Sequence, residues 1–151
     1  MGKEITLLIG LPGSGKSYLI KQRFSNSTNY IVFDDFKAGA VLDCSSFCFS
    51  KHYPEIIGQI KLGGKHIIIA DIDFCAADSY MEAKKILEWW IKGLKSNYKI
   101  KSIFFENDPL KCKSNLTRDN NRIFMVNNYT RFYSPNNMAL KGDEILKVCG
   151  D

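Results

Sequence analysis

A glycine-rich stretch near the N-terminus carries the clearest chemical signal in this sequence. Residues 10–17 fit the pattern G-x-x-x-x-G-K-[ST], which is typical of a loop that binds polyphosphates. Glycine lets the backbone curl and approach the ligand, so that several backbone N–H groups can donate to phosphate oxygens. The motif's lysine would place a cation beside the β- and γ-phosphates, and its serine hydroxyl can ligate Mg²⁺. The expected phosphate-binding residues are Gly10, Leu11, Pro12, Gly13, Ser14, Gly15, Lys16 and Ser17.

The segments on either side of this loop have the character that the motif requires. Residues 5–9 are apolar and predict a buried strand, and residues 16–24 can form a helix whose positive dipole end faces the loop. Strand, glycine-rich loop and helix in this order form a P-loop unit. The flanks therefore favour a phosphate-binding loop over a surface turn that fits the motif by chance.

Two further apolar runs end in acidic residues. Residues 30–33 precede Asp34 and Asp35, and residues 66–70 precede Asp71. Ligands of open α/β sheets bind at the carboxyl ends of the strands, so we expect these carboxylates near the loop. Asp71 fits the Walker B pattern and is expected to support Mg²⁺. One member of the pair is expected to accept a proton from a substrate hydroxyl, although either could instead cap the next helix.

The arginines are few and clustered. Arg118, Arg122 and Arg131 are three of only four arginines among 21 basic residues. The planar guanidinium group suits phosphate oxygens better than the point charge of lysine does. We therefore interpret the cluster as aimed at phosphates; the alternative is a helix with solvated charges.

The clustered arginines lie in a segment that resembles a lid. Asp108 and Pro109 predict the start of a helix that runs through Leu116. A polar loop over residues 117–122 and a second helix over residues 123–133 are expected to follow. A helix, an arginine-bearing loop and a helix form a plausible cover for a triphosphate, so we assign a lid to residues 108–134.

The rest of the chain completes an alternation of helices and strands. Ser79 and Glu82 have the spacing of a capping box, which predicts the start of a long helix. The apolar face of that helix places both Trp89 and Trp90 in the core. A further helix is expected over residues 54–62, and further strands over residues 99–105 and 144–148.

Length and composition indicate one soluble globular domain. A chain of 151 residues with 45% hydrophobic and 25% charged residues can form a single packed core. The net charge of +5 is compatible with a nucleotide or nucleic-acid ligand, and equally with a merely lysine-rich surface.

The cysteine content and the hydropathy of the chain indicate in which cellular compartment the protein is expected. Five cysteines without a C-x-x-C pair, and only two histidines, predict free thiols rather than a zinc site. Neither a signal peptide nor a membrane span is expected, so we predict a cytoplasmic protein without a membrane partner.

With these motifs in place, the whole chain resembles the polynucleotide-kinase-like group of small P-loop kinases, which includes zeta-toxin-like proteins. The loop G-x-P-G-S-G-K-S is common in that group. Its D-D-x-[RK] element corresponds to residues 34–37, which implies that Asp34 is the general base and that Lys37 contacts the substrate. Asp35 is assigned to the same substrate site.

The resemblance extends to the third strand and to the lid. The family sequence D-x-N corresponds to Asp71-Ile72-Asp73, and the lid motif [RN]-x-x-R corresponds to residues 115–118. This match implies that Arg118 contacts the phosphates of ATP and is catalytic together with Lys16. Arg122 is assigned to the same phosphates, and Arg131 to the substrate. The resemblance implies a three-layer α/β fold with a five-stranded parallel sheet of order 2-3-1-4-5, and ATP and Mg²⁺ as cofactors.

Three functions remain open at this point. The first is transfer of the γ-phosphate of ATP to the 5′-hydroxyl of a polynucleotide, which the resemblance and the mild basicity favour. The second is phosphorylation of a nucleoside, a nucleotide or another small metabolite. The third is a non-catalytic nucleotide-binding adaptor, because Phe33, Asp73 and Ser114 replace the Arg, Asn and Arg that are usual in the family.

Overall fold

The computed structural model describes residues 2–24, 29–34 and 52–148 of the chain. The strands are β1 (Glu4–Ile9), β2 (Tyr30–Asp34), β3 (His66–Ala70), β4 (Lys99–Phe105) and β5 (Glu144–Leu146). The helices are α1 (Lys16–Arg23), α2 (Tyr53–Leu62), the 3₁₀ helix η2 (Ile72–Cys75), α3 (Ala77–Gly93), α4 (Pro109–Asn115), α5 (Asn120–Tyr129) and α6 (Pro135–Met138).

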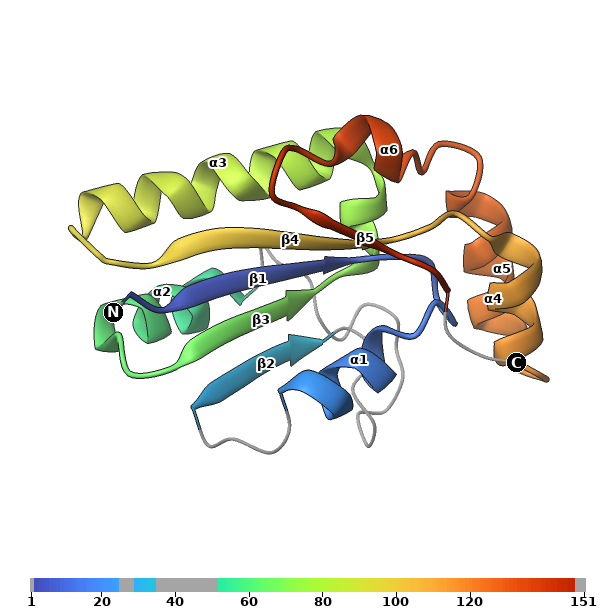
Figure 1. The fold of residues 1–151 in the computed structure, drawn as a ribbon, viewed down its shortest axis with the longest axis horizontal. Coiled ribbons are helices and arrows are strands. Elements are labelled where there is room, and N and C mark those ends of the chain that lie inside the picture. The colour runs from blue at the N-terminus through green and yellow to red at the C-terminus, as the bar shows by residue number, and fades with distance from the viewer. Residues whose placement is uncertain (1, 25–28, 35–51, 149–151) are drawn as a thin grey trace.

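The five strands form one parallel sheet in the order β2-β3-β1-β4-β5. This confirms the predicted strand order. β1 lies at the centre, with β3 on one side and β4 on the other, and its residues are almost all buried because both faces of the sheet are covered. In Figure 1 the strands run toward the same end of the molecule, where the P-loop follows β1.

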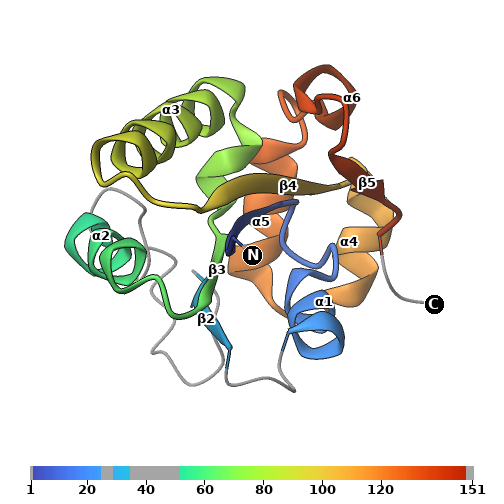
Figure 2. The ribbon, with the colours of Figure 1, turned by 60° about the vertical axis from the view of Figure 1, so that its left-hand side comes forward.

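Helices cover both faces, which gives three layers (Figures 1 and 2). Ile5, Leu7 and Ile9 of β1 belong to a core cluster that includes apolar residues of α2 and α3. Leu8 belongs to a second cluster with Leu19 of α1. The separation follows from the two-residue period of a strand, in which alternate side chains point to opposite faces.

The long helix α3 differs from its prediction at its start and in the position of one tryptophan. It begins at Ala77, directly after η2, and Ser79 lies inside it rather than capping it. Trp90 packs against the core as expected, but the side chain of Trp89 is 74% exposed. The prediction that both tryptophans are buried was therefore wrong for Trp89, because a straight helix can turn only one of two adjacent residues fully toward the sheet.

The arginine-bearing segment also differs from its prediction. The loop expected over residues 117–122 is shorter, because Asp119 caps α5 by accepting a hydrogen bond from the backbone N–H of Arg122 at 3.1 Å. Arg122 thus lies on the first turn of α5 rather than in a loop. As predicted, Asp108 caps α4, with Pro109 in its first turn.

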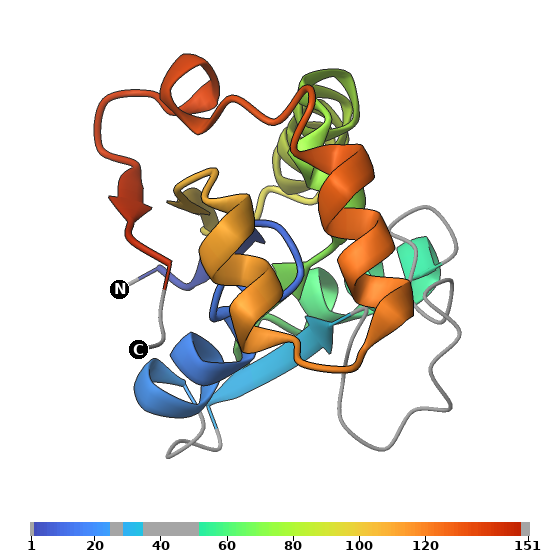
Figure 3. The same cartoon turned by 90° about the vertical axis from the view of Figure 1, so that its right-hand side faces the viewer.

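Figure 3 shows α4 and α5 across the end of the molecule at which the P-loop lies. No helix in the described parts of the chain is both long and apolar enough to cross a membrane.

Candidate phosphate-binding site

The P-loop connects β1 to α1 through a turn that depends on glycine. Gly13 and Gly15 have φ angles of 80° and 111°, a region that side-chain-bearing residues rarely adopt. The turn is closed by a hydrogen bond of 3.1 Å from the Ser14 N–H to the Leu11 carbonyl. Gly15 is then the N-cap of α1, so the helix N-terminus opens onto the loop.

Lys16 lies inside the curve of this loop. Its side chain is only 5% exposed, and its Nζ donates a hydrogen bond of 2.7 Å to the carbonyl of Gly10. This contact holds the ammonium group across the loop rather than in solvent. The hydroxyl of Ser14 is buried and has no hydrogen-bond partner among the described residues. A buried orphan hydroxyl beside a buried cation fits a site that receives an anionic oxygen.

Asp71, the expected Walker B residue, follows β3, the strand next to β1. Ala70 of β3 pairs with Leu8 of β1, so Asp71 is carried to the P-loop edge of the sheet. Asp71 is 2% exposed, and its Oδ1 accepts a hydrogen bond of 3.0 Å from the Asp73 N–H. The same side chain therefore caps η2, which fixes its orientation.

A magnesium ion at this edge would have few protein ligands. The described residues contain no group of three or more His, Cys, Asp or Glu side chains arranged to hold a metal ion. Mg²⁺ commonly takes one or two protein oxygens and completes its shell with waters and substrate phosphates. The buried Asp71 carboxylate and the exposed Ser17 hydroxyl suit that kind of site.

Asp34 is brought to the same edge by the neighbouring strand. It ends β2 and pairs with Ala70, the residue before Asp71, so the two acidic residues follow adjacent strands. Asp34 is half-buried. Asp35 and Lys37, which the sequence assigns to the substrate site, lie outside the described residues.

Helix α4 packs directly on the P-loop. The Asn115 side-chain amide donates a hydrogen bond of 2.9 Å to the Gly13 carbonyl. A Cβ atom added to Gly13 would lie 2.4 Å from the carbonyl oxygen of Cys112. Burial and, to a smaller extent, the Asp108 carboxylate raise the pKa of the Cys112 thiol to about 12 against the opposing effect of Lys16. The thiol is therefore a neutral packing group at neutral pH.

The three clustered arginines do not come together. Arg118 is exposed in the turn between α4 and α5, with a φ of 69°. Arg122 lies in the first turn of α5, where its Nε lies 3.3 Å from Asp119 Oδ2. Arg131 lies beyond Tyr129, the last residue of α5, which is about 10 Å from Arg122 along the helix axis for seven residues at 1.5 Å each. Arg118 and Arg122 therefore lie near the start of α5, and Arg131 lies beyond its end.

Two tyrosines that the sequence interpretation missed connect α5 and the segment after it to η2 and to the sheet. Tyr129 donates a hydrogen bond of 2.8 Å to Oδ1 of Asp73, which lies in η2 two residues after Asp71. Burial and the Asp73 carboxylate raise the pKa of Tyr129, so its hydroxyl stays protonated as the donor. The hydroxyl of the buried Tyr133 contacts the carbonyl oxygens of Ile9, at 3.1 Å, and Phe105, at the ends of β1 and β4. The four-residue spacing of Tyr129 and Tyr133, which places both on one side of a helical segment, was the available signal.

Comparison with solved structures identifies the class of fold. A fungal RNA kinase superposes with a TM-score of 0.60 at 11% identity, over 100% of this chain and 77% of that chain. A gluconokinase from Sinorhizobium meliloti 1021 superposes with a TM-score of 0.55 at 9% identity, over 99% and 84% of the two chains. A protein of the PezAT toxin–antitoxin system of Streptococcus pneumoniae has a TM-score of 0.56 at 14% identity, over 97% and 69%. The chain therefore has the fold of the small P-loop kinases, as predicted.

A sequence relative defines the family more narrowly. The chain is 31% identical over 137 residues to the uncharacterized protein R277 of Acanthamoeba polyphaga mimivirus, and the alignment covers 88% of each protein. The chain thus belongs to the same family as this viral protein. No protein-family model matches the chain.

Proposed function

We propose that this protein is a Mg²⁺-dependent kinase that transfers the γ-phosphate of ATP to a hydroxyl group, with the 5′-hydroxyl of a polynucleotide as the favoured acceptor. The observation that carries the proposal is the position of Lys16, buried on the Gly10 carbonyl inside a loop of P-loop geometry. Asp34 ends β2 and Asp71 follows β3, the strand between β2 and β1, so a base and a metal ligand would lie at the same sheet edge as the loop.

The P-loop would hold the donor phosphates. Backbone N–H groups of residues 10–17 and the N-terminus of α1 would donate to the phosphate oxygens, and Lys16 would exchange part of its contact with Gly10 for the β- and γ-phosphates. The orphan hydroxyl of Ser14 would gain a partner in the same step. Ser17 and Asp71 would hold Mg²⁺, which when bound neutralises charge on the β- and γ-phosphate oxygens.

Asp34 would accept the proton of the acceptor hydroxyl. The acceptor oxygen then forms its bond to the γ-phosphorus while the bond to the β-phosphate oxygen breaks, and ADP leaves. Arg118 and Arg122, at one end of the proposed lid over residues 108–134, would stabilise charge on the transferring group. Asp35, Lys37 and Arg131 would contact the substrate.

The polynucleotide acceptor is supported by the basic charge of the chain and by the fold that it shares with the fungal RNA kinase. The gluconokinase has the same fold, which keeps a small hydroxyl-bearing acceptor as the second candidate. We also propose a reducing, cytoplasmic compartment, in keeping with the buried Cys112, which forms no disulfide.

Transfer of labelled γ-phosphate tests the proposal. The acceptors are 5′-hydroxyl RNA, 5′-hydroxyl DNA, nucleosides, nucleotides and gluconate, with Asp34→Asn as the matched variant. We expect label on an oligonucleotide 5′ end and a loss on the order of 100-fold in Asp34→Asn, since a positioned general base contributes about that much. Label on a small acceptor alone would establish the second candidate. ATP binding without transfer to any acceptor would support a non-catalytic nucleotide-binding adaptor.

A further inference from the structure

Lysines gather at the end of the sheet opposite the P-loop. Two adjoining pockets of about 360 and 400 Å³ lie there and share Lys95, Ser96 and Tyr98 among their lining residues. We call them the amino-end pockets. Among the described residues that line them there is one carboxylate, Glu88, against six lysines: Lys3, Lys61, Lys84, Lys92, Lys95 and Lys99.

This charge is a product of the fold rather than of a basic run in the sequence. Lys3 precedes β1 and Lys99 begins β4, whereas Lys61 and Lys92 lie in the last turns of α2 and α3. In a parallel α/β sheet, strand starts and helix ends meet at the amino edge. Four separate segments therefore place positive charge on one surface, where the helix C-termini also favour cations.

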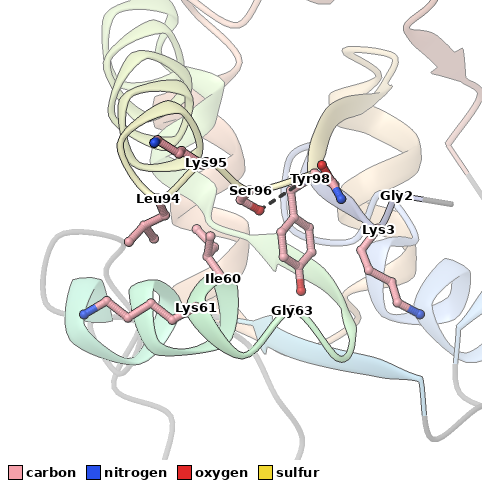
Figure 4. Close-up of a pocket in the computed structure, with 10 residues that line it drawn as sticks. Gly2, Lys3, Ile60, Lys61, Gly63, Leu94, Lys95, Ser96 and Tyr98 are labelled. Atoms are coloured by element: carbon pink, nitrogen blue, oxygen red, sulfur yellow. Dashed lines mark hydrogen bonds between the residues drawn. The ribbon is translucent and has the colours of Figure 1, made fainter.

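The lysines are arranged for an extended anion. In Figure 4 the ammonium groups of Lys61 and Lys95 point to the same side, and that of Lys3 points away from them on the other side of Tyr98. Tyr98 is buried, and its hydroxyl donates a hydrogen bond to the carbonyl of Lys65, so the floor between the lysines is fixed. Ammonium groups that diverge from a fixed floor cannot enclose one small anion, but they can each meet a different phosphate of a chain.

The surroundings favour a nucleic-acid chain among polyanions. Ser96 and Asn97 line one pocket with hydrogen-bonding groups suited to sugars and bases. Trp89, which is 74% exposed, precedes Lys92 by one helical turn on α3. Trp89 does not line either pocket, but an exposed aromatic ring on the helix that also carries the lysines offers a surface for a base to stack on, while the cations contact phosphates.

We propose that the amino-end pockets bind the phosphate backbone of single-stranded nucleic acid. Together with the proposed kinase function, on which this part rests, the pockets would hold the body of the strand whose 5′ end lies at the P-loop. The strand would have to span the length of the sheet, about 23 Å for the seven residues of β4. Short acceptors would then reach the P-loop without using the lysines.

The test measures binding without chemistry. Fluorescence anisotropy follows a labelled single-stranded RNA of about 20 nucleotides, which exceeds typical single-strand sites. The RNA carries a 5′-phosphate and so cannot act as an acceptor. The variant is the double substitution Lys61→Gln and Lys92→Gln. The control is Lys141→Gln and Lys147→Gln, which removes the same charge from exposed positions outside the pockets.

We expect the pocket variant to bind the RNA on the order of tenfold more weakly at about 0.1 M salt. The slope of log K against log salt should also become less steep by about 1.4, which is the contribution of two single-strand phosphates. The control variant should retain more of the affinity and more of the salt dependence. Trp89→Ala should weaken RNA binding but leave the binding of inorganic polyphosphate unchanged. Thermal melts of every variant confirm folding.

The outcomes separate this inference from the proposed kinase. RNA binding that depends on these lysines, without phosphate transfer to any acceptor, would support RNA binding by the pockets and reject the proposed kinase function. Two results together would overturn the proposal that the pockets bind RNA. The pocket variant would transfer phosphate to long RNA with an unchanged KM, and the pocket variant and the control would lose equal RNA affinity. Binding to vesicles with anionic lipids in place of RNA would likewise overturn this proposal and assign the surface to membranes.

Discussion

At the scale of single residues, the P-loop is defined as much by what packs on it as by its own sequence. Gly13 is needed for two independent reasons, since its φ angle is positive and the backbone of α4 leaves no space for a Cβ atom. Gly58, in the middle of α2, has neither constraint: its φ is not in the positive region, and a Cβ there would meet nothing within 4 Å.

These two glycines give a matched pair of substitutions. Gly13→Ala should lower the free energy of unfolding by more than about 2 kcal/mol, because it adds a collision with Cys112 to a left-handed backbone that itself costs about 1–2 kcal/mol. Gly58→Ala should raise it by about 0.5–1 kcal/mol through helix propensity. Urea unfolding checks both, and equal effects would mean that α4 does not pack on the loop as described.

Arg118 combines an unfavourable backbone with a proposed catalytic side chain. Replacing it with glycine should relieve the strain of its φ of 69°, so Arg118→Gly is expected to keep or raise the melting temperature. If the guanidinium stabilises the transferring phosphoryl group, the same variant should lose phosphate transfer by roughly 100-fold or more. A stable variant with full activity would remove Arg118 from the site.

At the scale of elements, the short edge strand β5 is held by charge as well as by pairing. Glu144 lies 3.0 Å from Arg23 of α1 and 3.1 Å from Lys101 of β4. Partial burial raises the pKa of Glu144, but the hydrogen bonds and charges of Arg23 and Lys101 outweigh it, so the pKa lies below its ordinary value. The three residues tie the last strand to a helix and to the preceding strand.

The lowered pKa predicts an acid-dependent loss of stability. Because the carboxylate is stabilised in the folded state, its contribution is present above the unfolded pKa of about 4.3 and is lost as the pH falls through the lower folded value. Glu144→Gln should therefore be less stable than wild type at pH 7, by less than about 1 kcal/mol for a partly exposed pair, and nearly equal to it in strong acid. Thermal melts of both proteins from strong acid to pH 7 measure this stability difference. A difference that stays constant with pH would mean that the Glu144 carboxylate is not stabilised in the folded state.

At the scale of the whole molecule, the sheet separates two surfaces of different chemistry. The carboxyl edge carries the P-loop, with Asp71 after β3 and Asp34 at the end of β2, and the amino edge carries the lysine-lined pockets. Helices α4 and α5 lie across the carboxyl edge, where Asn115 contacts the P-loop and Tyr129 contacts η2 (Figure 3). Ligand binding at this edge should therefore stabilise the entire domain.

ATP with Mg²⁺ should raise the melting temperature. A ligand at about 100 times its Kd adds about 2.7 kcal/mol to the folded state, which corresponds to a shift of roughly 5–10 °C for a domain of this size. Lys16→Ala should abolish both the shift and ATP turnover, because it removes the buried cation of the loop. Differential scanning fluorimetry measures the shift, and a shift that survives in Lys16→Ala would mean that ATP binds elsewhere.

The sequence by itself determined the P-loop and the Asp108 cap, because each depends on local spacing or on a contiguous motif. It predicted the strand order only through family resemblance, since the order joins strands that are distant in the sequence. It placed Arg122 in a loop and Trp89 in the core, since the start of α5 and the orientation of α3 depend on packing. Only the tertiary structure revealed the contacts of Asn115, Tyr129 and Tyr133 and the lysine surface at the amino edge. These features join residues that are distant in the sequence, and no local pattern encodes which strand ends and helix ends meet in space.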